Sequence, residues 1–274
     1  MDKRVVFHID DIWSSLSANR AALDLLKNGR ATSWSIMVPC SGFSDAISKT
    51  KKIKNIDLWV HLTLTSEWLS DNLKWRPTLP SQEVPSLIDD RWYFLSSVDD
   101  ILHKANPEEI KKELINQVEI AENSGIDISH LDSHMWVLFH KKLFPLYKDL
   151  ANIFKIQPFL TRPKPLDTLW HWFYECDQYI DDLVSEWFNV FDGFDADSLY
   201  QWKKDYNLHC IDRIKSIETW TTYFLLHVLD NNVNDIEKTP DFLARQNEYN
   251  FFRSNILDTL IEDQDIKKIM VKEL

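Results

Sequence analysis

The 274-residue sequence predicts an α/β fold with a mostly parallel sheet. Short apolar runs rich in β-branched residues alternate with segments of helical spacing, which is the pattern of repeated βα units. The length suits one large domain, typically a barrel or a sandwich, about as well as two small ones. No internal repeat and no Pro-, Gly- or Ser-rich linker divides the chain. We therefore predict a single domain over residues 1–274.

Each expected element has a local signal. The clearest helix begins at Asn106, an N-cap residue that is followed by Pro107 at the first helical position and by Glu109 in a capping-box arrangement. It ends at Gly125. The other helices are expected over 17–27, 43–51, 142–154 and 241–260. The strands are expected over 4–9, 33–38, 57–64, 126–131, 156–160 and 221–229.

Composition and charge exclude several classes of protein. The chain has 12 Trp and 15 Phe but only 4 Gly, where average usage would give about 19, so it is neither collagenous nor linker-like. A formal net charge of −12 makes a nucleic acid an unsuitable partner. No run of 18 or more apolar residues predicts a membrane span, and the acidic pair near the amino terminus excludes a secretory signal. The three cysteines, which are too scattered for a disulfide framework, fit a reducing cytoplasmic setting.

Titratable residues stand at the ends of four predicted strands. In parallel α/β folds the chemistry lies at the carboxyl ends of the strands, so these side chains are candidates for one site. They are Asp10 and Asp11 after the first strand, His61 in the third, His130, Asp132 and His134 around the fourth, and His227 in the strand at 221–229.

The residue types predict a catalytic metal centre. One carboxylate and two histidines leave an open position for water on a divalent ion such as zinc. Asp132 could accept a hydrogen bond from the second nitrogen of a ligating histidine. A neighbouring carboxylate could take a proton from the water, and a distant histidine could protonate the leaving group.

Structural alternatives exist for each motif. Asp10 and Asp11 could instead cap the helix expected at residue 17, because acids are favoured before a helix. His61 could be a hydrogen-bonded core residue. In extended chain, residues two apart share a face, so His130, Asp132 and His134 would lie on one side.

An aromatic-rich segment over 165–210 is expected to be a helical insertion. Its rings could stack on sugar faces as a lid over the site. Large aromatic side chains more commonly fill cores and subunit interfaces, so we favour a core or a homo-oligomer interface. The rings include Trp170, Trp172, Phe173, Tyr174, Tyr179, Trp187, Phe188, Phe191, Phe194, Tyr200, Trp202 and Tyr206.

Several segments, in the same order, resemble the YdjC-like carbohydrate deacetylases, a group that includes chitooligosaccharide (ChbG-type) and hopanoid (HpnK-type) deacetylases. They are the opening VVFHIDDIWSS, the strands ATSWSIMVPC and WVHLTLT, the segment ISHLDSHMW, the strand FLTRPKP, the late TYFLLHV and the closing RQNEYNFFRSNILDTLI. The resemblance spans essentially the whole chain.

The resemblance implies a TIM-barrel-like (β/α) fold of irregular form and one divalent metal ion, Mg²⁺ or Zn²⁺. It implies hydrolysis of an N-acetyl group on an amino sugar or oligosaccharide. By position, Asp11, His61 and His134 would bind the metal. Asp10 would be the general base, and His227 the general acid for the departing amine.

The resemblance also implies that Arg162 orients the base or the small carbohydrate substrate. This chain departs from the family around the late histidine, which is usually preceded by Glu four residues earlier and followed by Pro-Gly. Here Tyr223 precedes His227, and Val228-Leu229 follow it. Two alternatives stay open: a metal-dependent phosphoesterase, for which Arg76, Arg91 and Arg162 would bind phosphate, and a catalytically silent binding or scaffold protein.

Overall fold

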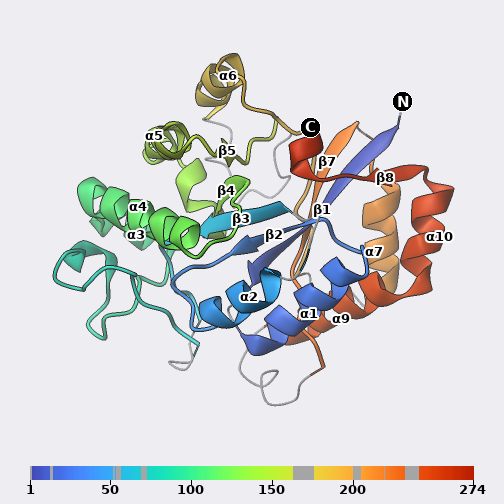
Figure 1. Cartoon of the computed structure of the whole chain (residues 1–274), viewed down its shortest axis with the longest axis horizontal. Coiled ribbons are helices and arrows are strands. Elements are labelled where there is room, and N and C mark those ends of the chain that lie inside the picture. The colour runs from blue at the N-terminus through green and yellow to red at the C-terminus, as the bar shows by residue number, and fades with distance from the viewer. Residues whose placement is uncertain are drawn as a thin grey trace.

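The computed structural model describes residues 2–12, 15–51, 53, 57–68, 73–162, 176–199, 205–218, 220–231 and 241–274. One sheet of 8 parallel strands curls through the centre of the molecule, with helices around it (Figure 1). The strand order is β5-β4-β3-β2-β1-β7-β6, with β8 beside β1. The strands are β1 (Lys3–Ile12), β2 (Ser33–Ile36), β3 (Asp57–Leu62), β4 (His130–Ser133), β5 (Gln157–Pro158), β6 (Gly193–Asp195), β7 (Thr221–Leu226) and β8 (Ile266–Lys268). The predicted α/β barrel is confirmed.

The barrel closes irregularly. Its edge strands β5 and β6 are joined just outside their bounds by a parallel bridge between Thr161 and Phe191. The Phe191 N–H donates to the Leu160 carbonyl at 2.9 Å, and the Arg162 N–H donates to the Phe191 carbonyl at 3.2 Å. An isolated bridge takes the place of a continuous hydrogen-bonded ladder between β5 and β6. The sheet is therefore strongly curled, and its two edges are joined by this bridge and the hydrogen bonds beside it.

The helices lie outside the sheet (Figure 1). The helix expected over 241–260 is two helices, because Ser254 takes an extended ψ of 158° between them. The predictions missed α3 and most of α7, and they gave α6 only as part of a helical insertion over 165–210. The α-helices are α1 (Leu16–Lys27), α2 (Phe43–Thr50), α3 (Val98–Lys104), α4 (Pro107–Asn123), α5 (Phe144–Phe154), α6 (Asp177–Ser185), α7 (Tyr206–Lys215), α9 (Phe242–Arg253) and α10 (Asn255–Asp263). Short 3-10 turns occupy Pro85–Leu87, His134–Phe139 and Val271–Glu273.

A layer of aromatic rings fills the barrel below the carboxyl ends of the strands. Tyr223 of β7 packs on Phe159 with ring centroids 4.5 Å apart and on Trp59 of β3 at 5.6 Å. The His8 ring of β1 lies 4.3 Å from Trp59. All four side chains are buried. Large rings bury large apolar areas, so this closely packed layer fills the barrel directly below the side chains at the carboxyl ends of the strands.

The aromatic segment over 165–210 contributes to the barrel itself. Phe191 and Phe194 of this segment pack against Phe159 and Tyr223; Phe191 is buried in the core and Phe194 is half-buried against it. Trp187 is 94% exposed. Six of the rings lie outside the described residues: Trp170, Trp172, Phe173, Tyr174, Tyr200 and Trp202.

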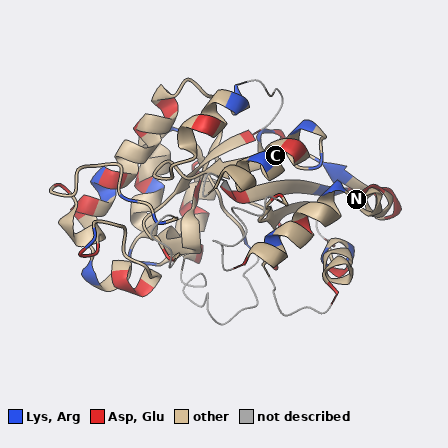
Figure 2. Ribbon diagram, turned by 90° about the horizontal axis from the view of Figure 1, so that it is seen from below, with Lys and Arg blue, Asp and Glu red and all other residues tan. Residues whose placement is uncertain are grey.

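Charged residues of both signs are interspersed on the outer helices and loops (Figure 2). The cysteines Cys40, Cys176 and Cys210 are all buried, and they form no disulfide bond in the described chain. Among the described residues, no helix combines the length and apolar character needed to cross a membrane.

The amino end of α4 differs in detail from the predicted capping box. The Asn106 side chain accepts from the Glu108 N–H at 2.9 Å, as an N-cap should. Glu109 instead accepts from the Ser86 N–H and hydroxyl, and the Ser86 oxygen accepts from the Asn106 N–H. The predicted reciprocal bond between Glu109 and the Asn106 N–H was wrong, because Ser86 of the preceding loop lies between these two groups and bonds to both.

Helix α4 also anchors the long connection between β3 and α3. The buried Glu113 carboxylate accepts from the N–H and hydroxyl of Thr78, the N–H of Leu79 and the amide of Gln117, at 2.8 to 3.0 Å. Gln117 in turn bonds both backbone groups of Thr63. Two side chains of one helix face thus hold the beginning and the middle of a connection that passes the carboxyl edge of the sheet.

Glu113→Ala should lower the free energy of unfolding by about 2 to 3 kcal/mol, because it leaves buried donors without an acceptor. Glu113→Gln keeps one acceptor oxygen and should lose less. Urea unfolding followed by tryptophan fluorescence measures both variants against Glu122→Gln, an exposed site on the same helix. Equal stability of Glu113→Ala and the unsubstituted protein would contradict the anchoring role.

Candidate active site

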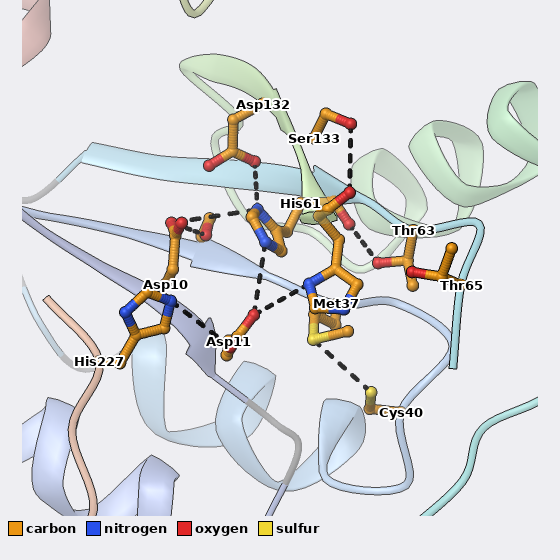
Figure 3. Close-up of polar contacts among 12 residues, drawn as sticks. Asp10, Asp11, Met37, Cys40, His61, Thr63, Thr65, Asp132, Ser133 and His227 are labelled. Carbon is orange, nitrogen blue, oxygen red and sulfur yellow. Dashed lines mark hydrogen bonds and ion pairs between the residues drawn. The ribbon is translucent and has the colours of Figure 1, made fainter. Parts of the chain in front are cut away.

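A bulge at the end of β1 sets the direction of the acidic pair. Asp11 has a left-handed φ of 55°, and the register between β1 and β2 shifts between Ile9 and Ile12. Alternation along an extended strand would send Asp10 and Asp11 to opposite faces. The bulge instead brings both carboxylates to the carboxyl end of the barrel (Figure 3). The helix-cap alternative is wrong, because Ser15 caps α1.

Asp11, His61 and His134 converge. The Asp11 Oδ1 atom lies 3.0 Å from His134 Nδ1 and 3.5 Å from His61 Nε2. One donor atom from each residue lies within 4.8 Å of the other two, and all three side chains are buried. The residues come from β1, β3 and the turn that follows β4, so the parallel sheet brings together positions far apart in sequence.

Each histidine of this cluster has a carboxylate on its other nitrogen. His61 Nδ1 lies 2.7 Å from Asp132 Oδ1, as Figure 3 shows. His134 Nε2 lies 3.1 Å from both carboxylate oxygens of Glu67. A carboxylate behind an imidazole fixes the orientation of the ring and leaves its inner nitrogen directed at the centre of the cluster.

Asp10 lies between the cluster and the aromatic layer, and one of its carboxylate oxygens makes the contacts that hold it. Its Oδ1 atom accepts from the Ser35 hydroxyl at 2.9 Å and from the Tyr223 hydroxyl at 3.5 Å, and it lies 2.9 Å from His8 Nε2. The same oxygen lies 4.0 Å from His61 Nδ1. These contacts anchor the Asp10 carboxylate beside the cluster.

His227 and Arg245 complete the surroundings of Asp11. The second Asp11 oxygen, Oδ2, lies 2.9 Å from an Arg245 nitrogen and 3.6 Å from His227 Nε2. Arg245 also donates to Asp241 on the same side of α9, at 2.8 Å. His227, which follows β7, therefore points one ring nitrogen at the cluster (Figure 3).

The carboxylates and cations of the cluster shift one another's pKa values: the carboxyl pKa of Asp11 falls, and the imidazole pKa values of His61 and His134 rise. Burial alone would raise the pKa of Asp11, but His134 and Arg245 hold it well below its usual value. Burial would lower the pKa of His134, yet Glu67 and Asp11 raise it to about 9. Burial would likewise lower the pKa of His61, which nearby carboxylates raise well above its usual value.

The two residues beside the cluster shift differently. Burial would raise the pKa of Asp10, but the charge of His61 and the hydrogen bond with His8 lower it to about 2. Burial lowers the pKa of His227, and Arg245 adds to this while Asp11 opposes it. Asp10 is thus charged near neutral pH.

The donor set fits a divalent cation. Two imidazole nitrogens and one carboxylate oxygen are the ligands found at three-residue catalytic sites that keep an open position. The carboxylates behind both histidines match the outer contacts of such sites. The candidate residues are Asp11, His61 and His134. A second group, His8, Asp10 and Asp132, has donor atoms equally close together, and its 2.9 Å contact between His8 and Asp10 is a hydrogen-bond distance.

The expectations for the His130–His134 motif and for Arg162 have different outcomes. His130 and Asp132 do share the inner face of β4, but His130 stacks on Trp59 with centroids 4.8 Å apart, and burial lowers its pKa to about 3. His134 has already left the strand for the 3-10 turn. Arg162 lies apart from the cluster, because its exposed guanidinium pairs with Asp181 of α6 at 2.5 Å. Its role toward substrate stays a prediction.

The sequence reasoning missed several contacts of the cluster. His8 could have been found, because period-2 alternation places it on the same face of β1 as Asp10. Glu67 lies in an irregular connection, and Arg245 lies on a helix distant in sequence. Neither position carries a local pattern that points to the site.

The sequence profile of the YdjC-like protein family matches residues 4–263 of this chain. This match confirms the resemblance that the strand-end motifs show, and it covers every candidate site residue.

Relatives of the chain include carbohydrate deacetylases. The chain is 29% identical over 153 residues to the carbohydrate deacetylase of Brevibacillus brevis, a match that covers 56% of this chain and 57% of that protein. It is 32% identical over 165 residues to the carbohydrate deacetylase of Thermus thermophilus, covering 60% of this chain and 55% of that protein. The matched segments thus span little more than half the length of these relatives.

A solved structure from Enterococcus faecalis V583, described as a cellobiose-phosphate cleavage protein, has the same fold over its whole length. It superposes with a TM-score of 0.80 at 20% sequence identity, covering 100% of this chain and 99% of that one. At this identity the likeness concerns the fold.

Glu67→Ala should weaken binding of Zn²⁺ about 10- to 100-fold, because the His134 ring loses the carboxylate that orients it. Isothermal titration of the metal-free protein measures this affinity. Glu83→Ala, an exposed site on the same connection, is the matched control and should leave the affinity unchanged. Wild-type affinity in Glu67→Ala would exclude His134 as a ligand oriented in this way.

Proposed function

The chain belongs to the YdjC-like protein family, and from that premise we propose that it is a metal-dependent hydrolase that removes the acetyl group from an N-acetylated amino sugar or oligosaccharide. The observation that carries the proposal is the convergence of Asp11, His61 and His134, with Asp10 and His227 beside them. The names of the relatives, which are carbohydrate deacetylases, support the same reaction.

In the proposed reaction, the residues that hold the cation are Asp11, His61 and His134. A divalent cation bound there would supply Lewis acidity, which lowers the pKa of water and polarises the amide carbonyl. The donor chemistry suits Zn²⁺, and Mg²⁺ remains the second candidate.

Asp10 is the proposed general base. Its Oδ1 atom is anchored by Ser35, Tyr223 and His8, so the carboxylate is held in one orientation beside the cluster. As a water oxygen bonds to the carbonyl carbon, the Asp10 carboxylate takes the proton of that water. The fixed position removes the need to orient the base during the reaction.

His227 is the proposed general acid. The carbon–nitrogen bond breaks only if the departing nitrogen receives a proton, because an amide anion is a very poor leaving group. In its imidazolium form His227 carries a proton on Nε2, the nitrogen that points at the cluster; it would deliver this proton as the carbon–nitrogen bond breaks and return to the neutral ring. The products are acetate and a free amino sugar.

The phosphoesterase alternative is less well supported. It requires cationic side chains near the cation to bind phosphate. Arg76 and Arg91 instead lie around the Tyr93 ring, at 4.7 and 6.0 Å from its centroid, and Arg162 is bound on α6. Arg245, which does reach the cluster, is engaged by two carboxylates.

Asp10→Asn should keep metal affinity and lower kcat by about 10²- to 10⁴-fold, because the amide accepts the same hydrogen bonds but takes no proton. Metal titration and acetate release measure the two effects on one preparation. Asp90→Asn, an exposed site, is the control. Full activity of Asp10→Asn would exclude Asp10 as the base.

The reaction class is tested by release of acetate and of phosphate from a panel of N-acetylated and phosphorylated sugars, with and without chelator. The proposal predicts acetate release that chelator abolishes and Zn²⁺ or Mg²⁺ restores. Chelator-sensitive phosphate release would select the phosphoesterase. Bound metal without turnover on any sugar would select the silent binding protein.

A further inference from the structure

A chain of hydrogen bonds supports His227 from behind. His227 Nδ1 lies 2.9 Å from the Ser198 hydroxyl oxygen. The Ser198 hydroxyl donates to Glu248 Oε2 at 2.8 Å, and the same Glu248 oxygen accepts from the His227 backbone N–H at 2.7 Å. Ser198 lies between β6 and α7, and Glu248 lies on α9. Two elements distant in sequence thus hold one imidazole.

The partners of Glu248 set the direction of this chain. Glu248 is fully buried, and its Oε1 atom pairs with an Arg213 nitrogen at 2.5 Å. Arg213 is itself buried, and it also pairs with Asp195 at 2.6 Å and donates to the Leu225 carbonyl at 2.7 Å. The Arg213 guanidinium and the His227 backbone N–H can only donate, so both Glu248 oxygens act as acceptors in this network.

The proton positions then follow in order. Because Glu248 only accepts, the Ser198 hydroxyl must donate to it. The Ser198 oxygen is left with lone pairs toward the histidine, so His227 must donate to it through Nδ1–H. The neutral imidazole is therefore protonated on Nδ1, and its unprotonated nitrogen is Nε2. That nitrogen is the one that lies 3.6 Å from Asp11 Oδ2, at the metal cluster.

We propose that Ser198 and Glu248 are positioning residues that fix the Nδ1–H tautomer of His227 and direct Nε2 to the reacting atoms. The catalytic part of this inference rests on the proposed function, and the tautomer does not. Without the acceptor at Ser198, the ring can rotate or protonate Nε2 in its neutral form. With Nδ1–H held by Ser198, the imidazolium form carries its transferable proton on Nε2 and returns to the Nδ1–H form when it gives that proton to the departing nitrogen. Either change disrupts this cycle, because the ring is then misplaced or loses its second proton from Nδ1 instead.

The test uses Ser198→Ala, which removes the hydroxyl but leaves Glu248 bonded to Arg213 and to the His227 N–H. Two-bond proton–nitrogen spectra of histidine-labelled full-length protein, at mildly alkaline pH, report which ring nitrogen is protonated. The His227 signals are assigned by their loss in His227→Gln. The expected result is an Nδ1–H tautomer in the unsubstituted protein and a shift of both nitrogen signals toward a tautomer mixture in Ser198→Ala.

Kinetics on the zinc-loaded protein give the second readout. Ser198→Ala should lower kcat for acetate release about 10- to 100-fold with little change in KM, because the ring is misplaced while substrate contacts remain. Ser198→Thr keeps a hydroxyl and should recover both the tautomer and most of kcat. Ser129→Ala, which removes a serine hydroxyl at the amino end of β4, is the matched control and should change neither.

An Nε2–H tautomer in the unsubstituted protein, or unchanged nitrogen signals in Ser198→Ala, would overturn the inference. Absence of acetate release from every sugar would remove the proposed function. The spectra would then still decide the tautomer, because they do not depend on turnover.

Discussion

The buried carboxylate of Asp11 is the constraint on which the site depends. Within the described chain its two oxygens face His61 and His134 on one side, and Arg245 and His227 on the other. A buried carboxylate is costly unless positive charge or hydrogen-bond donors surround it. The curled sheet meets this requirement by bringing the ends of β1, β3, β4 and β7 to one place. The bulge at the end of β1 then turns Asp11 toward them.

Support for the reacting groups comes from elements that differ from those the family resemblance implies. The resemblance expects a glutamate four residues before the late histidine, where this chain has Tyr223. The Tyr223 hydroxyl contacts Asp10 instead, and a carboxylate reaches His227 from α9 as Glu248. The departure at Tyr223 therefore leaves His227 with a carboxylate contact, at its backbone N–H directly and at its ring through Ser198.

The sequence could predict the parts of the site that follow from strand order. Parallel strands end at one edge of a sheet, so the titratable residues at four strand ends could be expected in one place. That Asp11, His61 and His134 among them would bind a metal came from the family resemblance. Glu67 and Ser198 could not be placed, because they lie in irregular connections whose path is set by tertiary contacts. The direction of Asp11 was also beyond reach, since one bulge reverses the alternation that a strand implies. Among the elements, the bounds of α6 and α7 could not be predicted, because the helical segment expected over 165–210 was identified by its aromatic residues and not by helix signals.

We propose that Asp11, His61 and His134 hold one divalent cation, and anomalous diffraction at the zinc absorption edge is the sharpest test of this site. Crystals of the protein grown with Zn²⁺ should show one strong peak bonded to these three side chains, at about 2.0 to 2.2 Å from the nitrogen and oxygen donors. A zinc peak elsewhere, with these three side chains bonded only to one another, would contradict the account.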